Sequence, residues 1–156
     1  MAKTEVVFGE RIAKDGELRL GCSAVIFDEK RERILLTQRT DNGQWCLPGG
    51  RIEAGESVAE ACVRETWEET GLKVRVLRLI GVYSNPNKLV IYPDGNKAHI
   101  IALSFEAEIT GGELGGSNET TDWGYFNLLE AEKLEMLAGH LERIQDAISG
   151  DVAIIK

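Results

Sequence analysis

Residues 50–72 constrain the fold of this chain more than any other segment, because they specify a glycine turn, a helix and a strand in succession. Ser57 and Glu60 have the spacing of a capping box, in which the serine hydroxyl accepts from a first-turn backbone N–H and the glutamate reaches back. This spacing predicts a helix that begins near Val58. Gly71 can adopt the left-handed conformation that ends helices, and the apolar residues after it predict a strand.

The predicted helix carries carboxylates on the side that begins apolar. At about 100° per residue, Glu65 and Glu69 continue a stripe that begins at Val58. Glu68 lies within about 100° of the centre of this stripe, whereas a solvated acidic face would lie opposite it. Like charges one helical turn apart repel, and their partial burial is costly unless a cation lies among them. The pattern therefore predicts a divalent cation, and oxygen ligands favour Mg²⁺, with Mn²⁺ as a substitute, over zinc.

The turn before the helix invites comparison with a phosphate-binding P-loop. Gly50, Gly55 and Ser57 fit the pattern G-x-x-x-x-G-K-[ST], but Glu56 occupies the lysine position. A lysine there would meet phosphate directly, whereas a glutamate would repel phosphate unless a metal ion lay between them. The charge at this position therefore argues against a P-loop.

The same segment resembles the signature of the Nudix hydrolases, G-x5-E-x7-R-E-U-x-E-E-x-G-U, in which U is a bulky aliphatic residue. The one departure is Thr66, which keeps a β-branched shape but adds a hydroxyl where the family has an aliphatic side chain. The other fixed positions are matched by Gly50, Glu56, Arg64, Glu65, Glu68, Glu69, Gly71 and Leu72. The similarity extends over residues 20–128, and it implies a MutT-like α/β fold, an α/β/α sandwich with a mixed β-sheet.

Turn signals divide the remaining sequence into runs that are mostly extended, without a linker, a repeat or a low-complexity stretch. We therefore expect a single Nudix hydrolase domain over residues 1–156, with the Nudix box at 50–72. A second helix is predicted over residues 130–149, where leucine and isoleucine recur at helical spacing. Strands are predicted over residues 5–13, 18–27, 33–39, 74–83, 97–109 and 123–126.

The resemblance implies a nucleotide pyrophosphatase: a Mg²⁺-dependent hydrolase that cleaves the pyrophosphate linkage of a nucleoside diphosphate joined to another moiety. Substrates of this type include nucleotides, ADP-ribose and nucleotide-sugars. Arg64 is expected to orient a box carboxylate. The metal ligands that the resemblance implies are Glu65, Glu68, Glu69 and the Gly50 carbonyl, with Glu56 as a more peripheral acid.

The general base is left open between a box glutamate and a carboxylate on a later loop. Glu119 is the best loop candidate, Asp122 is a weaker one, and Glu53 lies at a variable position of the box loop. Loops are both exposed and a frequent place for functional groups, so the position of Glu119 alone does not decide its role.

Two other interpretations belong to different functional classes. A catalytically silent Nudix-like domain would bind a nucleotide and regulate a partner, but it is expected to lack metal-site glutamates, and none is lost here. An isoprenoid diphosphate isomerase would use a catalytic cysteine, for which Cys46 is the candidate, although the remaining pattern does not support that reaction.

Composition limits the partners and the compartment. The formal net charge of −8 argues against general binding to nucleic acid or to an anionic membrane, while a bound metal could still attract a small anionic substrate. No apolar run approaches the length of a membrane span and no signal peptide is evident, so we expect a cytoplasmic protein. The odd number of cysteines, 3, without metal-ligand spacing, fits free thiols in a reducing compartment.

Several side chains outside the box have a structural and a functional interpretation. We expect His99 to be structural or at the edge of a substrate site, and His140 to lie at the surface. Trp67, with Val63 one turn earlier, should meet a neighbouring element or a second subunit, which leaves a homodimer open. The aromatic residues Tyr83, Tyr92 and Phe105 could stack on a nucleobase or pack in the core.

Overall fold

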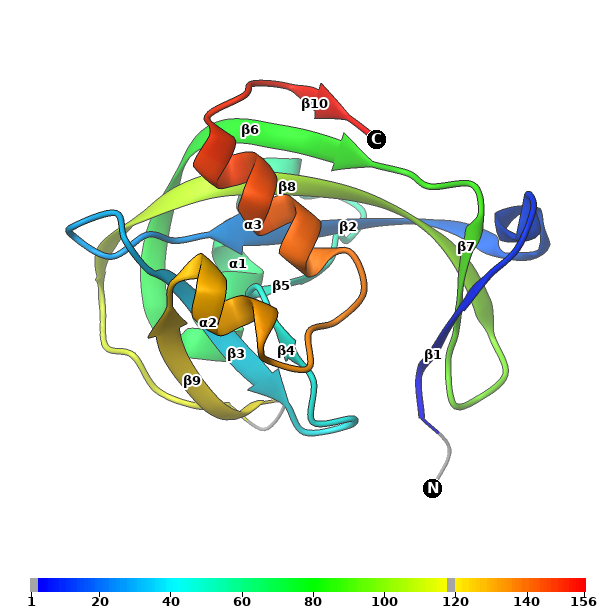
Figure 1. Cartoon of the computed structure of the whole chain (residues 1–156), viewed down its shortest axis with the longest axis horizontal. Helices are drawn as coiled ribbons and strands as arrows, with labels where there is room; N and C mark the ends of the chain where they lie inside the picture. The colour runs from blue at the N-terminus through cyan, green and yellow to red at the C-terminus, as the bar shows by residue number, and fades with distance from the viewer. Residues whose placement is uncertain (1–2, 118–119) are drawn as a thin grey trace.

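A computed structural model describes residues 3–117 and 120–156, and over these residues the chain forms a seven-stranded mixed sheet and a smaller three-stranded sheet (Figure 1). The larger sheet is built on β8 (Lys97–Gly112), which is parallel to β2 (Glu17–Val25) and antiparallel to β6 (Leu72–Tyr83). Its other strands are β1 (Glu5–Phe8), β5 (Gly49–Arg51), β7 (Lys88–Ile91) and β10 (Ile154–Ile155). The smaller sheet contains β4 (Trp45–Cys46), β3 (Ile34–Arg39) and β9 (Thr120–Phe126), in that order.

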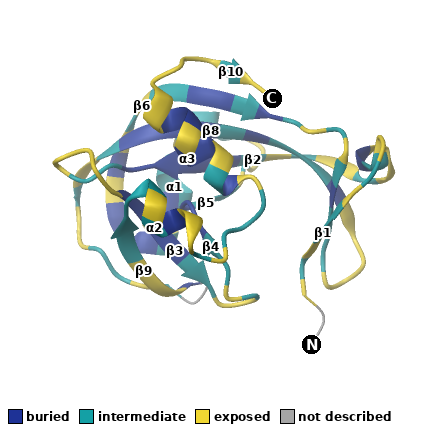
Figure 2. Cartoon of the chain, viewed as in Figure 1, coloured by how far each residue is buried: buried dark blue, intermediate teal, exposed yellow. Residues whose placement is uncertain are grey.

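Helices cover both faces of the larger sheet. Neighbouring residues of β2 point to opposite faces: Ala24 belongs to the core beneath α1 (Val58–Thr70), whereas Val25 belongs to the core beneath α2 (Leu128–Glu132) and α3 (His140–Ser149). In Figure 2, β6 and β8 carry buried segments, and exposed residues lie on the turns of α2 and α3. The chain is therefore the α/β/α sandwich with a mixed sheet that its sequence predicts.

Two predicted elements differ substantially from the structure. The strand predicted over residues 5–13 stops at Phe8, and a 3-10 helix, η1, occupies Ile12–Asp15. The helix predicted over residues 130–149 is divided into α2 and α3 by a connection in which the Trp45 backbone bonds to Glu135 and Leu137, and in which Gly139 has a φ of 87°. The helical spacing of leucine and isoleucine continues from α2 to α3, so the sequence pattern does not show that the helix is divided. The short strands β4, β5, β7 and β10 were not predicted.

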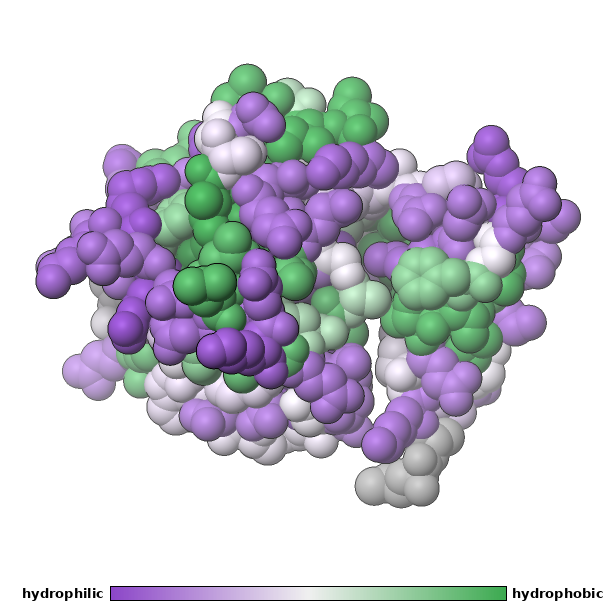
Figure 3. All heavy atoms as spheres, in the orientation of Figure 1, coloured by the Kyte–Doolittle hydropathy of each residue, from purple (hydrophilic) through white to green (hydrophobic). Residues whose placement is uncertain are grey.

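The strands β1 and β7, together with η1, form an arm at one end of β8. In the space-filling view this arm stands apart from the body of the molecule, with a cleft between them (Figure 3). None of the helices in the described residues is both long and apolar enough to span a lipid bilayer.

Candidate active site

The helix α1 is fixed at both ends by the contacts that its sequence predicts. The backbone N–H of Glu60 donates to Ser57 Oγ at 3.1 Å, and the Glu60 carboxylate accepts from the Ser57 N–H at 3.4 Å. At the other end Gly71 has a φ of 75°, and its N–H donates to the Trp67 carbonyl. The carboxylates of this helix are therefore presented by a segment with defined ends.

Arg64 ties the loop before α1 to the acidic side of the helix. Its Nε and Nη2 atoms donate to the two carboxylate oxygens of Glu56, at 3.0 and 2.7 Å. Its Nη1 atom donates to Glu65 at 3.0 Å and to Glu68 at 3.2 Å, and Nη2 also reaches the Arg51 carbonyl. The Arg64 guanidinium, helped by the Glu53 N–H, lowers the pKa of Glu56 to about 2. Three carboxylates thus share one cation.

The strand β5 lies directly against two of the box glutamates. The Gly49 N–H donates to Glu69 Oε2 at 3.2 Å. A Cβ atom on Gly50 would overlap the Glu65 carboxylate, so only glycine lets the two approach this closely. The Gly50 carbonyl also accepts a weak hydrogen bond from the Cys22 thiol, across the β2–β5 pair. The Gly50 backbone and the carboxylates of Glu65 and Glu69 therefore meet at one edge of the sheet.

The oxygen-rich donor set of the box fits a hard divalent cation in its chemistry. The close approach of Glu65 to the Gly50 backbone places a carboxylate beside a peptide group, with no side chain between them. Within residues 3–117 and 120–156, no three Asp, Glu, His or Cys side chains converge closely enough to hold a metal ion by themselves. In this structure Arg64 supplies the positive charge among the carboxylates.

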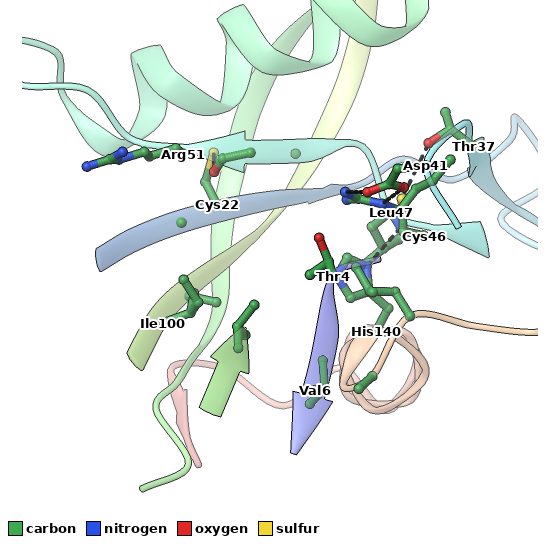
Figure 4. A pocket seen from close by; sticks show the side chains of 18 of the residues that line it. Thr4, Val6, Cys22, Thr37, Asp41, Cys46, Leu47, Arg51, Ile100 and His140 are labelled. Carbon is green, nitrogen blue, oxygen red and sulfur yellow. Dashed lines mark hydrogen bonds and ion pairs between the residues drawn. The ribbon is translucent and has the colours of Figure 1, made fainter. Parts of the chain in front are cut away.

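A cavity of about 470 Å³ opens beside the box. Gly49, Gly50 and Glu69 line it from the box side, and residues of the arm and of α3 line it from the other sides. Figure 4 shows Arg51 near one end of this cavity, and Cys46 and His140 near the other. A cavity of this size can enclose most of a small nucleotide-type ligand.

The other acidic candidates do not join this site in the described part of the chain. Glu119, the loop candidate for the general base, lies outside the described residues. Asp122 is exposed on β9 and its carboxylate accepts from the Trp123 N–H. Glu53 is exposed and contributes a backbone N–H to Glu56.

Sequence reasoning placed His140 at the surface, and this expectation is wrong. His140 is buried in the first turn of α3, and its Nδ1 atom accepts from the Leu47 N–H at 3.0 Å. The sequence predicted one continuous helix over residues 130–149. In the structure α3 starts at His140, and the His140 side chain points into the protein. His99 is partly buried in β8, with Nε2 3.2 Å from the Ser84 carbonyl oxygen.

The candidate aromatic residues separate into two groups. Tyr92 lines the cavity and lies beneath the Arg19 guanidinium, 5.1 Å from its ring centroid. Tyr83 and Phe105 are buried in the protein. The apolar pair on α1 is also divided, because Val63 packs against the core while 54% of Trp67 is exposed.

Cys46 is buried next to the cavity, and its burial raises the pKa of its thiol to about 11. The thiol is therefore protonated at neutral pH, which disfavours the cysteine nucleophile that an isomerase would need. Cys22, Cys46 and Cys62 are all free and buried.

Several cavity residues could not be selected from the sequence. Arg39 forms a paired contact with Asp41, at 2.9 and 2.8 Å, beside the segment that leads to the box. Lys88, on β7, and Arg143, on α3, line the same cavity although they lie far apart in the sequence. Neither lies in a motif, so only tertiary contacts reveal them.

Comparison with known proteins gives consistent results. A family model described as a NUDIX domain matches residues 17–147. An ADP-ribose pyrophosphatase of Methanocaldococcus jannaschii is 40% identical over 109 residues, which cover 68% of this chain and 61% of that protein. A MutT-like protein of Streptomyces ambofaciens is 36% identical over 118 residues, covering 76% and 70%. The solved structure of an ADP-ribose pyrophosphatase from Streptococcus suis has a TM-score of 0.67 at 26% identity, covering 88% and 96%.

Proposed function

Because this chain belongs to the Nudix family, we propose that it is a Mg²⁺-dependent pyrophosphohydrolase of a nucleoside diphosphate joined to another moiety. The observation that carries this proposal is the arrangement of the box. Its carboxylates are all retained, and they are gathered around Arg64 and the Gly50 backbone at the edge of a cavity. Two similar proteins named as ADP-ribose pyrophosphatases make ADP-ribose the first substrate to test.

Glu65, Glu68, Glu69 and the Gly50 carbonyl would hold the cation, with Glu56 at the periphery. A bound divalent cation would neutralise phosphate oxygens and lower the pKa of an attacking water. Arg64 donates to Glu65 and Glu68 on one side of the helix, and its contact with Glu56 fixes the loop. The Gly49 N–H fixes one oxygen of Glu69. The chain therefore restricts the carboxylates before substrate arrives, which lowers the cost of ordering them.

The proton of the attacking water needs a carboxylate acceptor. We retain two candidates for it, a box glutamate and Glu119. Replacing Glu119 by Gln distinguishes them: a loss of kcat comparable to that of a box variant assigns the proton to Glu119, and near-normal turnover assigns it to the box.

The proposal is tested with phosphate-release assays at saturating Mg²⁺ on ADP-ribose, nucleoside triphosphates, sugar nucleotides, dinucleoside polyphosphates and capped RNA ends. We expect turnover of at least one nucleoside diphosphate derivative. Glu68→Gln or Glu69→Gln should lower kcat by at least about a hundredfold with an unchanged fold, because each removes charge from the metal site with little change in shape. Circular dichroism checks the fold.

Glu60→Gln is the matched control. It removes one carboxylate from the same helix, but Gln can still serve in the capping box, so its kcat should stay near the wild-type value. Near-normal turnover of Glu68→Gln or Glu69→Gln would contradict the assignment of the metal site. Nucleotide binding without turnover of any substrate would favour the silent regulatory domain instead.

A further inference from the structure

A buried guanidinium lines the α3 side of the cavity without an acidic partner. Arg143 is 6% exposed, its Nη1 atom donates to Ser23 Oγ at 3.2 Å, and its guanidinium lies 5.4 Å from the Tyr83 ring centroid. Its Nε atom has no hydrogen-bond partner among the described residues, and no carboxylate there forms an ion pair with it. An unpaired buried charge is costly to keep, so this arrangement calls for a compensating group.

His140 adds a second donor beside Arg143. A backbone N–H can only donate, so the Leu47 N–H requires that His140 Nδ1 carries no proton. Burial and the nearby cations lower the pKa of His140 well below its usual range, so the ring is neutral and its proton lies on Nε2. This Nε2 atom is 3.4 Å from Arg143 Nη1. Two donors therefore lie side by side, an arrangement that one acceptor within reach of both would stabilise.

Lys88 brings a third donor from the arm. A Cβ atom on Gly139 would lie 3.5 Å from Lys88 Nζ and 3.9 Å from Arg143 Nη2, which places both cations around one point. Burial and the Arg143 charge lower the pKa of the Lys88 amine. Over residues 3–117 and 120–156, Lys88 forms no ion pair with a carboxylate.

The acidic side chains closest in sequence to Arg143 have their short contacts with Tyr83 and Lys156, although Glu142 also lies near enough to Arg143 and Lys88 to favour their charged forms. Asp146 accepts from the Tyr83 hydroxyl at 2.8 Å and from Lys156 Nζ at 3.0 Å, and Glu142 lies 3.9 Å from that same amine. Gly139 is the N-cap residue of α3 and has no side chain to cap the first N–H groups of the helix. The positive end of the helix dipole therefore adds to the Arg143 charge instead of offsetting it.

This donor cluster lies close to the box. Leu47 holds His140 and Gly49 holds Glu69, and these two contacts are made by N–H groups two residues apart on the same segment. Two residues of extended chain span about 7 Å. One ligand can therefore reach the box carboxylates and the cluster together.

We propose that Arg143, Lys88 and the His140 Nε2–H form a subsite for a compact oxyanion, a phosphate or a carboxylate, that the substrate carries in addition to the diphosphate that is cleaved. The inference rests on the proposed function for the identity of the substrate, but the subsite itself requires no turnover. An anion there would accept from all three donors and would link the arm to α3.

Thermal unfolding in inorganic phosphate tests the subsite alone, on protein from which metal has been removed by dialysis. Phosphate at ten times its dissociation constant should raise the unfolding temperature of the wild type by about 3–6 °C. Arg143→Gln and Lys88→Gln should each lose most of this gain. Arg75→Gln removes an equal charge from the surface of β6 and should keep it. General stabilisation by salt would raise all four proteins alike and would overturn the proposal.

If Arg143→Gln does not fold, Lys88→Gln decides the outcome, because Lys88 lies on the arm and not in the main core. The subsite is contradicted if phosphate does not raise the unfolding temperature of the wild type. It is also contradicted if phosphate raises the unfolding temperature of Lys88→Gln as much as that of the wild type. Neither result depends on catalysis, so failure of the subsite and failure of the proposed hydrolase remain distinguishable.

Substrate pairs then distinguish the two sources of the anion. ADP-ribose is compared with its 2′-phosphorylated form, and UDP-glucose with UDP-glucuronate, each pair differing by one phosphate or one carboxylate. We expect the wild type to prefer the charged member of one pair in kcat/KM by at least about tenfold, as for one charge-assisted contact. Lys88→Gln should reduce that ratio toward one. Equal kcat/KM values within both pairs would overturn the assignment to substrate.

Discussion

The box beside the cavity and the α3 side of the cavity differ in how their charges are paired. On the box side, one guanidinium, that of Arg64, is shared by the carboxylates of Glu56, Glu65 and Glu68. On the α3 side, Arg143 and Lys88 form no ion pair with a carboxylate of the described chain. The first region contains acids in excess of cations. In the second, Glu142 lies near both cations, but its side chain is 50% exposed and it forms no ion pair with either of them.

This difference indicates what each region lacks. Excess carboxylates are relieved by a divalent cation, and unpaired buried cations are relieved by an anion. Under the proposed function, a diphosphate with metal would satisfy the box, and a further anionic group would satisfy the α3 side. The box and the α3 side of the cavity would thus be complementary to different parts of one ligand.

The largest effect is expected from Gly50→Ala, which tests whether the box side depends on close approach. A Cβ atom there would overlap the Glu65 carboxylate, so that carboxylate must move away from the strand. We expect kcat/KM to fall by about a hundredfold or more, since small displacements of positioning groups cost about that much. Gly9→Ala is the control, because its Cβ would meet Ile12 only at ordinary contact distance, 3.6 Å. A fully active Gly50→Ala enzyme would contradict the packing described for Glu65.

A smaller effect, on stability, is expected at Glu106. This buried carboxylate is paired with arginines, as the box carboxylates are, but it does not line the cavity. Arg31 and Arg78 each donate to it, at 2.9 and 3.0 Å. Burial alone would raise the pKa of Glu106, but the two arginines outweigh burial and lower it. Glu106→Gln should therefore reduce the free energy of unfolding by about 1–3 kcal/mol at pH 7.

The stability difference between wild type and Glu106→Gln should depend on pH in a defined direction. A carboxylate with a lowered folded-state pKa contributes stability above its unfolded pKa, about 4.3, and loses it as the pH falls through the folded value. The difference between wild type and Glu106→Gln in urea unfolding should therefore shrink below about pH 4. Glu108→Gln, on the same strand and more exposed, should change stability by less than about 1 kcal/mol. A constant difference down to pH 2 would contradict the role of the arginines.

The smallest effect is expected at Thr66, the departure from the family pattern. Its side chain is fully buried, and its hydroxyl has no hydrogen-bond partner within the described residues. Thr66→Val should raise stability by about 1 kcal/mol, or the unfolding temperature by about 2–4 °C, because it removes an unpaired polar group at nearly constant shape.

Thr70→Val provides the matched comparison on the same helix. The Thr70 hydroxyl donates to the Thr66 carbonyl at 2.6 Å and accepts from the Leu72 N–H at 3.1 Å, so its loss should destabilise the protein. Thr66→Val should leave the phosphate-dependent gain unchanged. An unpaired polar group in the core would then only lower stability, whereas the unpaired cations that face the cavity would bind an anion.

The parts of the fold that sequence predicted depend on local contacts. Ser57 and Glu60 bond to each other within one turn, and Gly71 ends α1 by its own conformation, so both boundaries follow from neighbouring residues. The division of the second helix was missed because leucine spacing continues across Gly139. The place of His140 was missed for the same reason, since its direction depends on where α3 begins.

The sequence by itself determined the family of this chain, the capped helix and the set of carboxylates, because these lie within a short segment at fixed spacing. Tertiary structure alone decided that Gly50 meets Glu65 across the sheet edge, and that Leu47 bonds to His140, which is 93 residues away. It also brought Lys88 from the arm and Arg143 from α3 to one cavity. No local pattern encodes such a meeting, because the burial and pairing of a charge depend on which distant elements pack around it.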